Sequence, residues 1–266
     1  MKNSKNGITV ALHMSKGGVG KTTMSMNLAY SLSKFGKTIL IDADMQGNLT
    51  SQLDNEFTEK SKPEFLDVLQ KKLPLKDAIT QIRQPSEKNG CKGIDLIGTR
   101  SSKALETYFE GEFRNSPFSL KAIIKELKDM NYKYIFFDLP PSLPYYVNVI
   151  LSYIDEIIPI VIPEDLAVES LALYATNLKE IQTNLDAVFT DIHYFLINMI
   201  NKQSQVHQYF CEDLRNSMPF EIFEINRSEA IVKANTNKLF IQEYMSNNKI
   251  CETLNTLAEK IANDED

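Results

Sequence analysis

A glycine-rich run that contains two lysines carries the clearest chemistry in the sequence. It reads Ser-Lys-Gly-Gly-Val-Gly-Lys-Thr-Thr over Ser15–Thr23 and joins an apolar run to an amphipathic stretch. Glycines let the backbone turn tightly enough for several N–H groups to face one anion, and the start of a helix adds partial positive charge. In such a loop Lys21 can reach the β- and γ-phosphates of a nucleotide, and the Thr22 hydroxyl can ligate Mg²⁺. The run therefore predicts a phosphate loop, with Ser15 in the place of the usual first glycine.

Acidic residues end two other apolar runs. Asp42 and Asp44 follow the first of them, within Ile-Asp-Ala-Asp-Met-Gln-Gly-Asn. Asp138 ends the second run, Tyr134–Phe137, and precedes Leu-Pro-Pro-Ser in the pattern called Walker B. Because the carboxyl ends of parallel strands share one sheet edge, these acids are expected beside the phosphate loop. Asp44 is a candidate to orient the attacking water and Asp42 to shape the shell of Mg²⁺ and Lys21. Asp138 is expected to contact Mg²⁺ through water.

The elements that position these residues alternate between strands and helices. Short apolar runs without polar alternation are typical of strands that are buried on both faces of a parallel sheet. The predicted strands are Ile8–Leu12, Thr38–Ile41, Ile94–Ile97, Tyr134–Phe137, Ile157–Ile162 and Ile192–Ile197. The predicted helices are Lys21–Phe35, Phe65–Lys71, Leu120–Met130, Ala167–Leu185, Gln205–Asn216 and Cys251–Ile261. We therefore predict an α/β fold, a mostly parallel twisted sheet flanked by helices, as a single domain over residues 1–266.

The phosphate loop resembles a known variant. Lys-Gly-Gly-Val-Gly-Lys-Thr-Thr is similar to the deviant Walker A motif of the ParA/MinD-type ATPases, P-loop proteins that form ATP-sandwich dimers. The resemblance implies ATP or ADP with Mg²⁺, and it implies that Lys16 crosses the dimer interface to the phosphates of the other subunit's nucleotide. The residues that it assigns to the nucleotide are Lys16, Gly17, Gly18, Val19, Gly20, Lys21, Thr22 and Thr23. Those that it assigns to catalysis are Lys16, Lys21 and Asp44, and those for the metal are Thr22, Asp42 and Asp138.

Further motifs extend this resemblance along the chain. The Asp-x-Asp-x-Gln-Gly-Asn run is similar to switch I of partition ATPases, with Met45 where that family usually has proline. Asp138–Ser142 resembles switch II. The family holds adenine with two later loops, which assigns Asn198 and Asn226 to the base; Asn226 replaces the proline of the family's Ile-Pro-Arg.

Within this superfamily the Gln-Gly-Asn signature favours a ParA-type partition ATPase for plasmid or chromosome DNA. The resemblance then implies an ATP-dependent homodimer that binds DNA without sequence preference, and a ParB-like centromere-binding partner that stimulates hydrolysis. Such a protein is expected in the cytoplasm, on the nucleoid when ATP is bound. Two alternatives stay open. One is an ATP-switched positioning adaptor that docks a protein rather than DNA, and the other is a metabolic ATPase or amidoligase relative with a further substrate pocket.

The charge distribution decides where DNA could bind. The net charge is −6, but residues 71–133 hold 13 Lys or Arg against 8 Asp or Glu, and residues 211–266 hold 6 against 11. Because non-specific binding needs cations that neutralise phosphates, the basic middle region is the first candidate surface. The candidates there are Lys71, Lys72, Arg83, Lys88, Lys92, Arg100 and Lys103. Later candidates are Arg215, Arg227, Lys233 and Lys238.

Membrane binding and metal clusters are not expected. No stretch approaches the roughly 18 apolar residues of a membrane span. The segment Cys251–Asp266 carries acidic residues that an anionic membrane would repel, and Lys260 is its one cation. These acids are Glu252, Glu259, Asp264, Glu265 and Asp266. The three cysteines, Cys91, Cys211 and Cys251, lack metal-ligand spacing, which fits a reducing cytoplasm.

Overall fold

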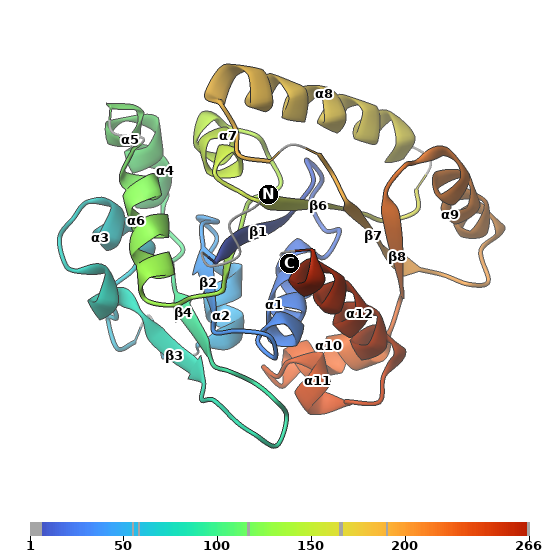
Figure 1. Cartoon of the computed structure of the whole chain (residues 1–266), viewed down its shortest axis with the longest axis horizontal. Coiled ribbons are helices and arrows are strands. Elements are labelled where there is room, and N and C mark those ends of the chain that lie inside the picture. The colour runs from blue at the N-terminus through green and yellow to red at the C-terminus, as the bar shows by residue number, and fades with distance from the viewer. Residues whose placement is uncertain are drawn as a thin grey trace.

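An eight-stranded sheet lies at the centre of the computed structural model, which describes residues 7–54, 56–57, 59–115, 118–164, 167–189 and 191–264 (Figure 1). The strand order is β3-β4-β2-β5-β1-β6-β7-β8, and β3 runs antiparallel to β4 while the other neighbours pair in parallel. The strands are β1 (Ile8–His13), β2 (Thr38–Asp42), β3 (Thr80–Arg83), β4 (Ile94–Ile97), β5 (Tyr134–Asp138), β6 (Glu156–Val161), β7 (Tyr194–Ile200) and β8 (Glu221–Asn226). The predicted α/β fold with a mostly parallel sheet is confirmed.

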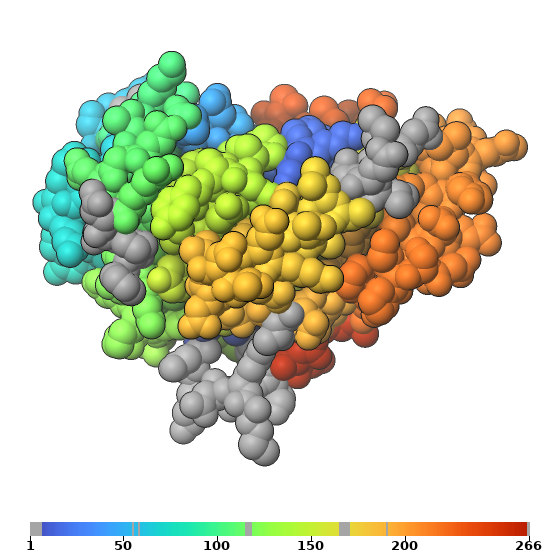
Figure 2. Space-filling view, turned by 90° about the horizontal axis from the view of Figure 1, so that it is seen from above, coloured from blue at the N-terminus to red at the C-terminus, as the bar shows by residue number. Residues whose placement is uncertain are grey.

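Helices cover both faces of this sheet. Figure 1 shows α7 (Tyr145–Ser152) and α8 (Ala167–Leu185) along one face, and α1 (Lys21–Leu32) and α12 (Lys249–Asn263) along the other. Figure 2 shows α8 across the first of these faces, between the α4–α6 group and α9. The remaining helices are α2 (Asn48–Leu53), α3 (Phe65–Leu69), α4 (Lys103–Glu110), α5 (Glu112–Asn115), α6 (Phe118–Asp129), α9 (Gln205–Ser217), α10 (Glu229–Thr236), α11 (Ile241–Tyr244) and a 3₁₀ turn at Leu75–Ala78.

The central strands are apolar because helices cover them on both faces. Every residue of β2, β4, β5 and β6 is buried. The register places Asp42 of β2 directly beside Asp138 of β5, each at the carboxyl end of its strand. The phosphate loop follows the neighbouring strand β1 at the same edge. The topology therefore brings the three predicted motifs together.

Some elements differ from the sequence-based expectations. The edge strands β3 and β8 were not predicted, because they are only partly buried and carry no continuous apolar run. Strand β7 begins at Tyr194 instead of Ile192 and extends to Ile200, with an irregular register between Ile197 and Ile200. Among the described residues no helix has the length and apolar character that a membrane crossing requires. Glu265 and Asp266, part of the acidic C-terminal segment, lie outside the described residues.

Candidate active site

The phosphate loop ends in an open helix N-terminus. Gly20 caps α1 in the left-handed region, with φ at 92°, and gives the N–H groups of the first turn no side-chain acceptor. Gly18 also has a positive φ of 74°. A Cβ atom on Gly20 would lie 2.4 Å from the amide nitrogen of Asn198, so both conformation and space require glycine here. The uncapped N–H groups at this end form a site for an anion such as a phosphate.

Lys21, the first residue of α1, is buried beneath this loop. Its ammonium group donates to the carbonyl oxygen of Lys16 at 2.8 Å and to that of Met14 at 3.4 Å. Burial lowers the pKa of Lys21, while the negative charges of Asp138 and Asp44 act in the opposite direction. The loop backbone thus holds the ammonium group next to the place where the helix N-terminus would bind phosphate.

Asp42 and Asp138 form a fully buried acidic pair. The Thr22 hydroxyl donates to Oδ2 of Asp138 at 2.8 Å, and the backbone N–H and hydroxyl of Thr50 donate to Oδ2 of Asp42 at 2.8 and 2.7 Å. Burial raises the pKa of Asp42 to about 7 despite the Thr50 bonds. The pKa of Asp138 is raised well above its ordinary value, first by burial and then by the charge of Asp42. A nearby cation would stabilise the charged form of both carboxylates.

The residues present fit a hydrated magnesium ion. Oδ1 of Asp138 is buried and finds no hydrogen-bond partner within the described residues, which leaves it ready to accept from a metal-bound water. The Thr22 hydroxyl lies beside it. In the part of the chain that the structure describes, no group of three or more His, Cys, Asp or Glu could hold a metal by itself. This donor set suits Mg²⁺, which keeps several waters and takes further ligands from substrate phosphates.

Asp44 belongs to a loop that its own hydrogen bonds close. Its Oδ1 accepts from the backbone N–H of Gln46 at 3.0 Å, and its carbonyl oxygen accepts from Gly47 at the same distance. Gly47 has a φ of 63°, and a Cβ atom there would lie 2.6 Å from the carbonyl oxygen of Thr99. The turn is therefore defined even with Met45 in place of proline. It presents the mostly buried Asp44 carboxylate close enough to Lys21 to affect that residue's pKa.

Lys16, the additional lysine, has an acidic partner within the same chain. Its ammonium group forms an ion pair with Glu164, which follows β6. The two side chains are 34% and 52% exposed, so this ion pair lies at the surface. Within one subunit Glu164, rather than a phosphate, is the partner of Lys16.

A cavity of about 520 Å³ adjoins the phosphate loop. Both residues predicted to contact adenine line it, and the amide nitrogen of Asn198 donates to the carbonyl oxygen of Val19 at 2.9 Å. Asn198 thus supports the loop as well as the cavity wall. The lining residues that the sequence analysis had not assigned to the nucleotide are Met24, Ile162, Pro163, Glu164, Met199, His207, Arg227, Ser228, Ile231, Val232 and Asn235. Met199 reaches the cavity from the irregular part of β7. Its φ of 55° is not predicted by any pattern in the sequence.

Comparison with known proteins gives this site a family. The AAA domain family matches residues 7–191, more than half of the chain. The chain belongs to the ParA/MinD family of ATPases. The family membership that the sequence motifs indicated is confirmed.

Relatives with similar sequences differ in the roles that their names give. The chromosome partitioning protein ParA of Caulobacter vibrioides is 24% identical over 217 residues, covering 81% of this chain and 78% of that protein. The cell division protein PomZ of Myxococcus xanthus is 26% identical over 206 residues, covering 77% of this chain and 61% of PomZ.

Solved structures of the family share the fold. A plasmid partition protein of Borrelia burgdorferi gives a TM-score of 0.73 at 25% identity, covering 96% of this chain and 99% of that one. The septum site-determining protein MinD of Pyrococcus horikoshii, complexed with Mg-ADP, gives 0.70 at 20% identity, covering 96% and 95%.

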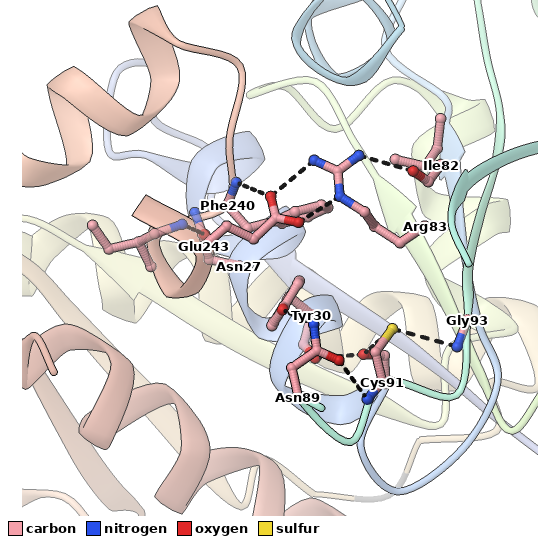
Figure 3. A network of polar contacts seen from close by, with 11 residues as sticks. Asn27, Tyr30, Ile82, Arg83, Asn89, Cys91, Gly93, Phe240 and Glu243 are labelled. Carbon is pink, nitrogen blue, oxygen red and sulfur yellow. Dashed lines mark hydrogen bonds and ion pairs between the residues drawn. The ribbon is translucent and has the colours of Figure 1, made fainter. Parts of the chain in front are cut away.

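In this member of the ParA/MinD family, several basic residues considered for DNA binding already have acidic partners. Arg83 on β3 pairs with Glu243 of α11 through two hydrogen bonds of 2.6 and 2.8 Å and lies over the Phe240 ring (Figure 3). The ion pairs of the other residues in this group are Arg100–Glu64, Arg215–Glu224, Lys72–Asp67 and Lys233–Glu229. The Arg83 pair joins the edge of the sheet to the C-terminal helices, which gives this arginine a structural role.

Other candidates for DNA binding are exposed. Lys238 donates to the carbonyl oxygen of Ser51. The exposed candidates without an ion pair given above are Lys71, Lys88, Lys92, Lys103 and Arg227. Arg227 is also one of the residues that line the cavity beside the phosphate loop.

Proposed function

We propose that this chain is a ParA-type partition ATPase whose ATP-bound dimer binds DNA without sequence preference. In this proposal Mg²⁺-dependent hydrolysis to ADP and phosphate resets the dimer, and a ParB-like centromere-binding partner stimulates it. The protein then works in the cytoplasm, on the nucleoid while ATP is bound. The observation that carries the proposal is the joint placement of Lys21, Thr22 and the buried Asp42–Asp138 pair around one open helix N-terminus.

The geometry supports triphosphate binding in three ways. The first turn of α1 has no side-chain cap from Gly20, and Lys21 is the first residue of that helix. The adjoining cavity is large enough for a base. When bound, Mg²⁺ would neutralise charge on the phosphates, with the Thr22 hydroxyl as a ligand and Asp42 and Asp138 acting through water. Asp44 is the carboxylate available to orient the attacking water.

A dimer requires Lys16 to change partners. For its ammonium group to reach the other subunit's phosphates, the surface ion pair with Glu164 must open. Exposed pairs of this kind stabilise by at most about 1 kcal/mol, whereas contacts between lysine and phosphate are charge-assisted on both sides. The exchange is therefore favourable once ATP is present, which couples nucleotide binding to dimerisation.

The role in DNA partition is supported by relatives and by surface charge. The Caulobacter and Borrelia proteins are a chromosome and a plasmid partition protein by name. Lys71, Lys88, Lys92 and Lys103 are exposed in the basic middle region, and a dimer would present each of them twice.

The test is binding of random-sequence duplex DNA by an Asp44→Ala protein, with ATP or ADP, over a series of salt concentrations. Loss of Asp44 should slow turnover about 100-fold or more while ATP stays bound, so the dimer accumulates. We expect tight binding with ATP alone and a steep decrease of affinity with salt, whose slope gives the number of neutralised phosphates. An Asp44→Ala/Lys16→Ala double variant, defective in dimerisation, is the control and should not bind.

A second function is favoured by the similarity to PomZ, a cell division protein. The same ATP-switched dimer would then dock a protein and position it, without DNA. An Asp44→Ala protein that dimerises with ATP yet binds no DNA in low salt would contradict the partition proposal and support this one.

A further inference from the structure

His13, the last residue of β1, is fully buried and uses both ring nitrogens. Its Nε2 lies 3.1 Å from the carbonyl oxygen of Pro140, and its Nδ1 lies 3.0 Å from the hydroxyl oxygen of Tyr174. Pro140 belongs to switch II and Tyr174 to α8. One side chain therefore joins three segments that are far apart in the sequence.

The chemistry of the partners fixes the state of the ring. A carbonyl oxygen can only accept, so Nε2 carries the hydrogen and donates to Pro140. Burial, and next the positive charge of Lys21, lower the pKa of His13 to about 3, so the ring is neutral. Nδ1 then has a free lone pair and accepts from the Tyr174 hydroxyl. The two hydrogen bonds run in one direction, from α8 through His13 to switch II.

Switch II has few donors of its own with which to hold its position. After Asp138 the chain continues through Leu139, Pro140 and Pro141, and neither proline has an N–H group. Its second proline lies against the phosphate loop, since a Cβ atom on Gly17 would be 3.9 Å from Cγ of Pro141. The His13 bond anchors the preceding carbonyl from inside the protein. The segment that carries Asp138 is thus held between the phosphate loop and His13.

We propose that His13 is a positioning residue for ATP hydrolysis: it holds the switch II backbone so that Asp138 stays aligned with Thr22, and it ties that alignment to α8. This inference rests on the proposed ATPase function and deepens it. His13 lies three positions before Lys16, outside the phosphate-loop motif, and Pro140 and Tyr174 are its hydrogen-bond partners. Its effect on the reaction passes through Pro140.

The first test compares two substitutions of this residue. His13→Leu removes both hydrogen bonds, and we expect turnover to fall about tenfold or more because small misalignments of a catalytic site are costly. ADP affinity should stay within about twofold, since ADP binds mainly to the phosphate loop and the cavity. His13→Gln keeps one donor and one acceptor and should restore most of the turnover. Equal turnover in His13→Leu and wild type would overturn the positioning role.

A second variant keeps the proposal testable if His13→Leu fails to fold. Tyr174→Phe removes the hydroxyl alone, and Tyr153→Phe, at the end of α7, is the matched control. We expect a lower kcat with unchanged KM in Tyr174→Phe and no change in the control. In ¹⁵N NMR of the nucleotide-free protein, the Nδ1 resonance of His13 should move by several ppm in Tyr174→Phe. The signal, one of three histidines, is assigned by its loss in His13→Gln.

The possible failures are distinguishable. If the wild type hydrolyses ATP and both Tyr174→Phe and His13→Leu do so at the same rate, the positioning role is overturned and the proposed function stands. If the wild type hydrolyses ATP no faster than Asp44→Ala, the proposed function is overturned, and with it the role of His13 in hydrolysis. An Nδ1 resonance that does not respond to Tyr174→Phe overturns the hydrogen-bonded connection itself.

Discussion

Both edges of the sheet hold acidic side chains that accept hydrogen bonds, but in the described part of the chain the carboxyl-terminal edge leaves one buried oxygen of Asp138 without a partner. At the amino-terminal edge Asp95 accepts from the Tyr132 hydroxyl and pairs with Lys37 at 3.2 Å. Asp155 accepts from the backbone N–H and the hydroxyl of Thr9, each at 2.9 Å. At the carboxyl-terminal edge Oδ1 of Asp138 has no partner within the described residues.

This difference distinguishes buried acids that are satisfied within the fold from one that is left with an open oxygen. A buried carboxylate with a full set of donors stabilises the fold, whereas one that lacks donors costs free energy unless a ligand supplies them. Burial raises the pKa of both Asp42 and Asp138, and the charge of Asp44 on the first and of Asp42 on the second acts in the same direction. A cation at this edge would offset these effects. The same residue type therefore has opposite effects at the two ends of parallel strands.

The largest expected effect comes from removing the buried cation of the carboxyl edge. Lys21→Ala should reduce ATP affinity by at least about 100-fold, because a charge-assisted contact to phosphate is lost. Lys37→Ala is the matched control, since Lys37 serves an acid at the other edge. It should leave ATP affinity unchanged and lower the stability. Titration calorimetry measures the ATP affinity of both variants, Lys21→Ala and Lys37→Ala. Wild-type affinity in Lys21→Ala would contradict the assignment of the phosphate loop.

A second pair of variants tests the two edges by stability. Asp95→Asn should lower the free energy of unfolding of the nucleotide-free protein by about 1–3 kcal/mol, because Lys37 and Tyr132 lose a charged partner. Asp138→Asn should leave it unchanged or raise it, since a poorly satisfied buried charge is removed. Urea unfolding at pH 8 measures both. A large loss of stability in Asp138→Asn would show that this acid has a structural role.

Dimerisation should respond in opposite directions to two substitutions in the surface ion pair. Lys16→Ala should weaken ATP-dependent dimerisation about tenfold, because the cation that crosses the interface is missing. Glu164→Gln frees Lys16 and should strengthen ATP-dependent dimerisation by a few-fold, which corresponds to the free energy of an exposed ion pair. Sedimentation in ATP, with ADP as the control state, measures the dimer. Weaker dimerisation in Glu164→Gln would mean that Glu164 itself contributes to the interface.

The sequence predicted the part of the fold and site that depends on local patterns. Strands β1, β2, β4, β5 and β6 are buried on both faces, so each appears as an apolar run. The phosphate loop and the two acidic motifs were predicted because each one is a short segment at the end of such a strand.

The rest depends on contacts between distant segments. Strands β3 and β8 have an exposed side and thus no continuous run. Asn235 bonds to Thr23 across 212 positions, and His13 reaches Pro140 and Tyr174 across 127 and 161 positions. The acidic partners of Arg83 and Arg215 likewise became visible only in the fold, so a count of basic residues overestimated the surface available to DNA.

The smallest expected effect is on the pH dependence of stability, through the buried and hydrogen-bonded His13. His13 has two hydrogen bonds as a neutral ring, with Lys21 as the charged group that acts on it, and its pKa falls from 6.5 to about 3. The unfolded chain therefore binds a proton at His13 between these values and the folded chain does not. Stability from this group is present above about pH 6.5 and is lost as the pH falls towards 3. One proton corresponds to a slope of about 1.4 kcal/mol per pH unit.

His13→Gln removes this proton without removing the donor and acceptor. The free energy of unfolding of the nucleotide-free variant should therefore depend less steeply on pH than that of wild type over this window, by up to that slope. Urea unfolding at half-unit steps of pH and constant ionic strength measures the difference. Equal slopes would mean that His13 binds its proton in the folded protein too. The ring would then donate from both nitrogens, which is incompatible with accepting from Tyr174.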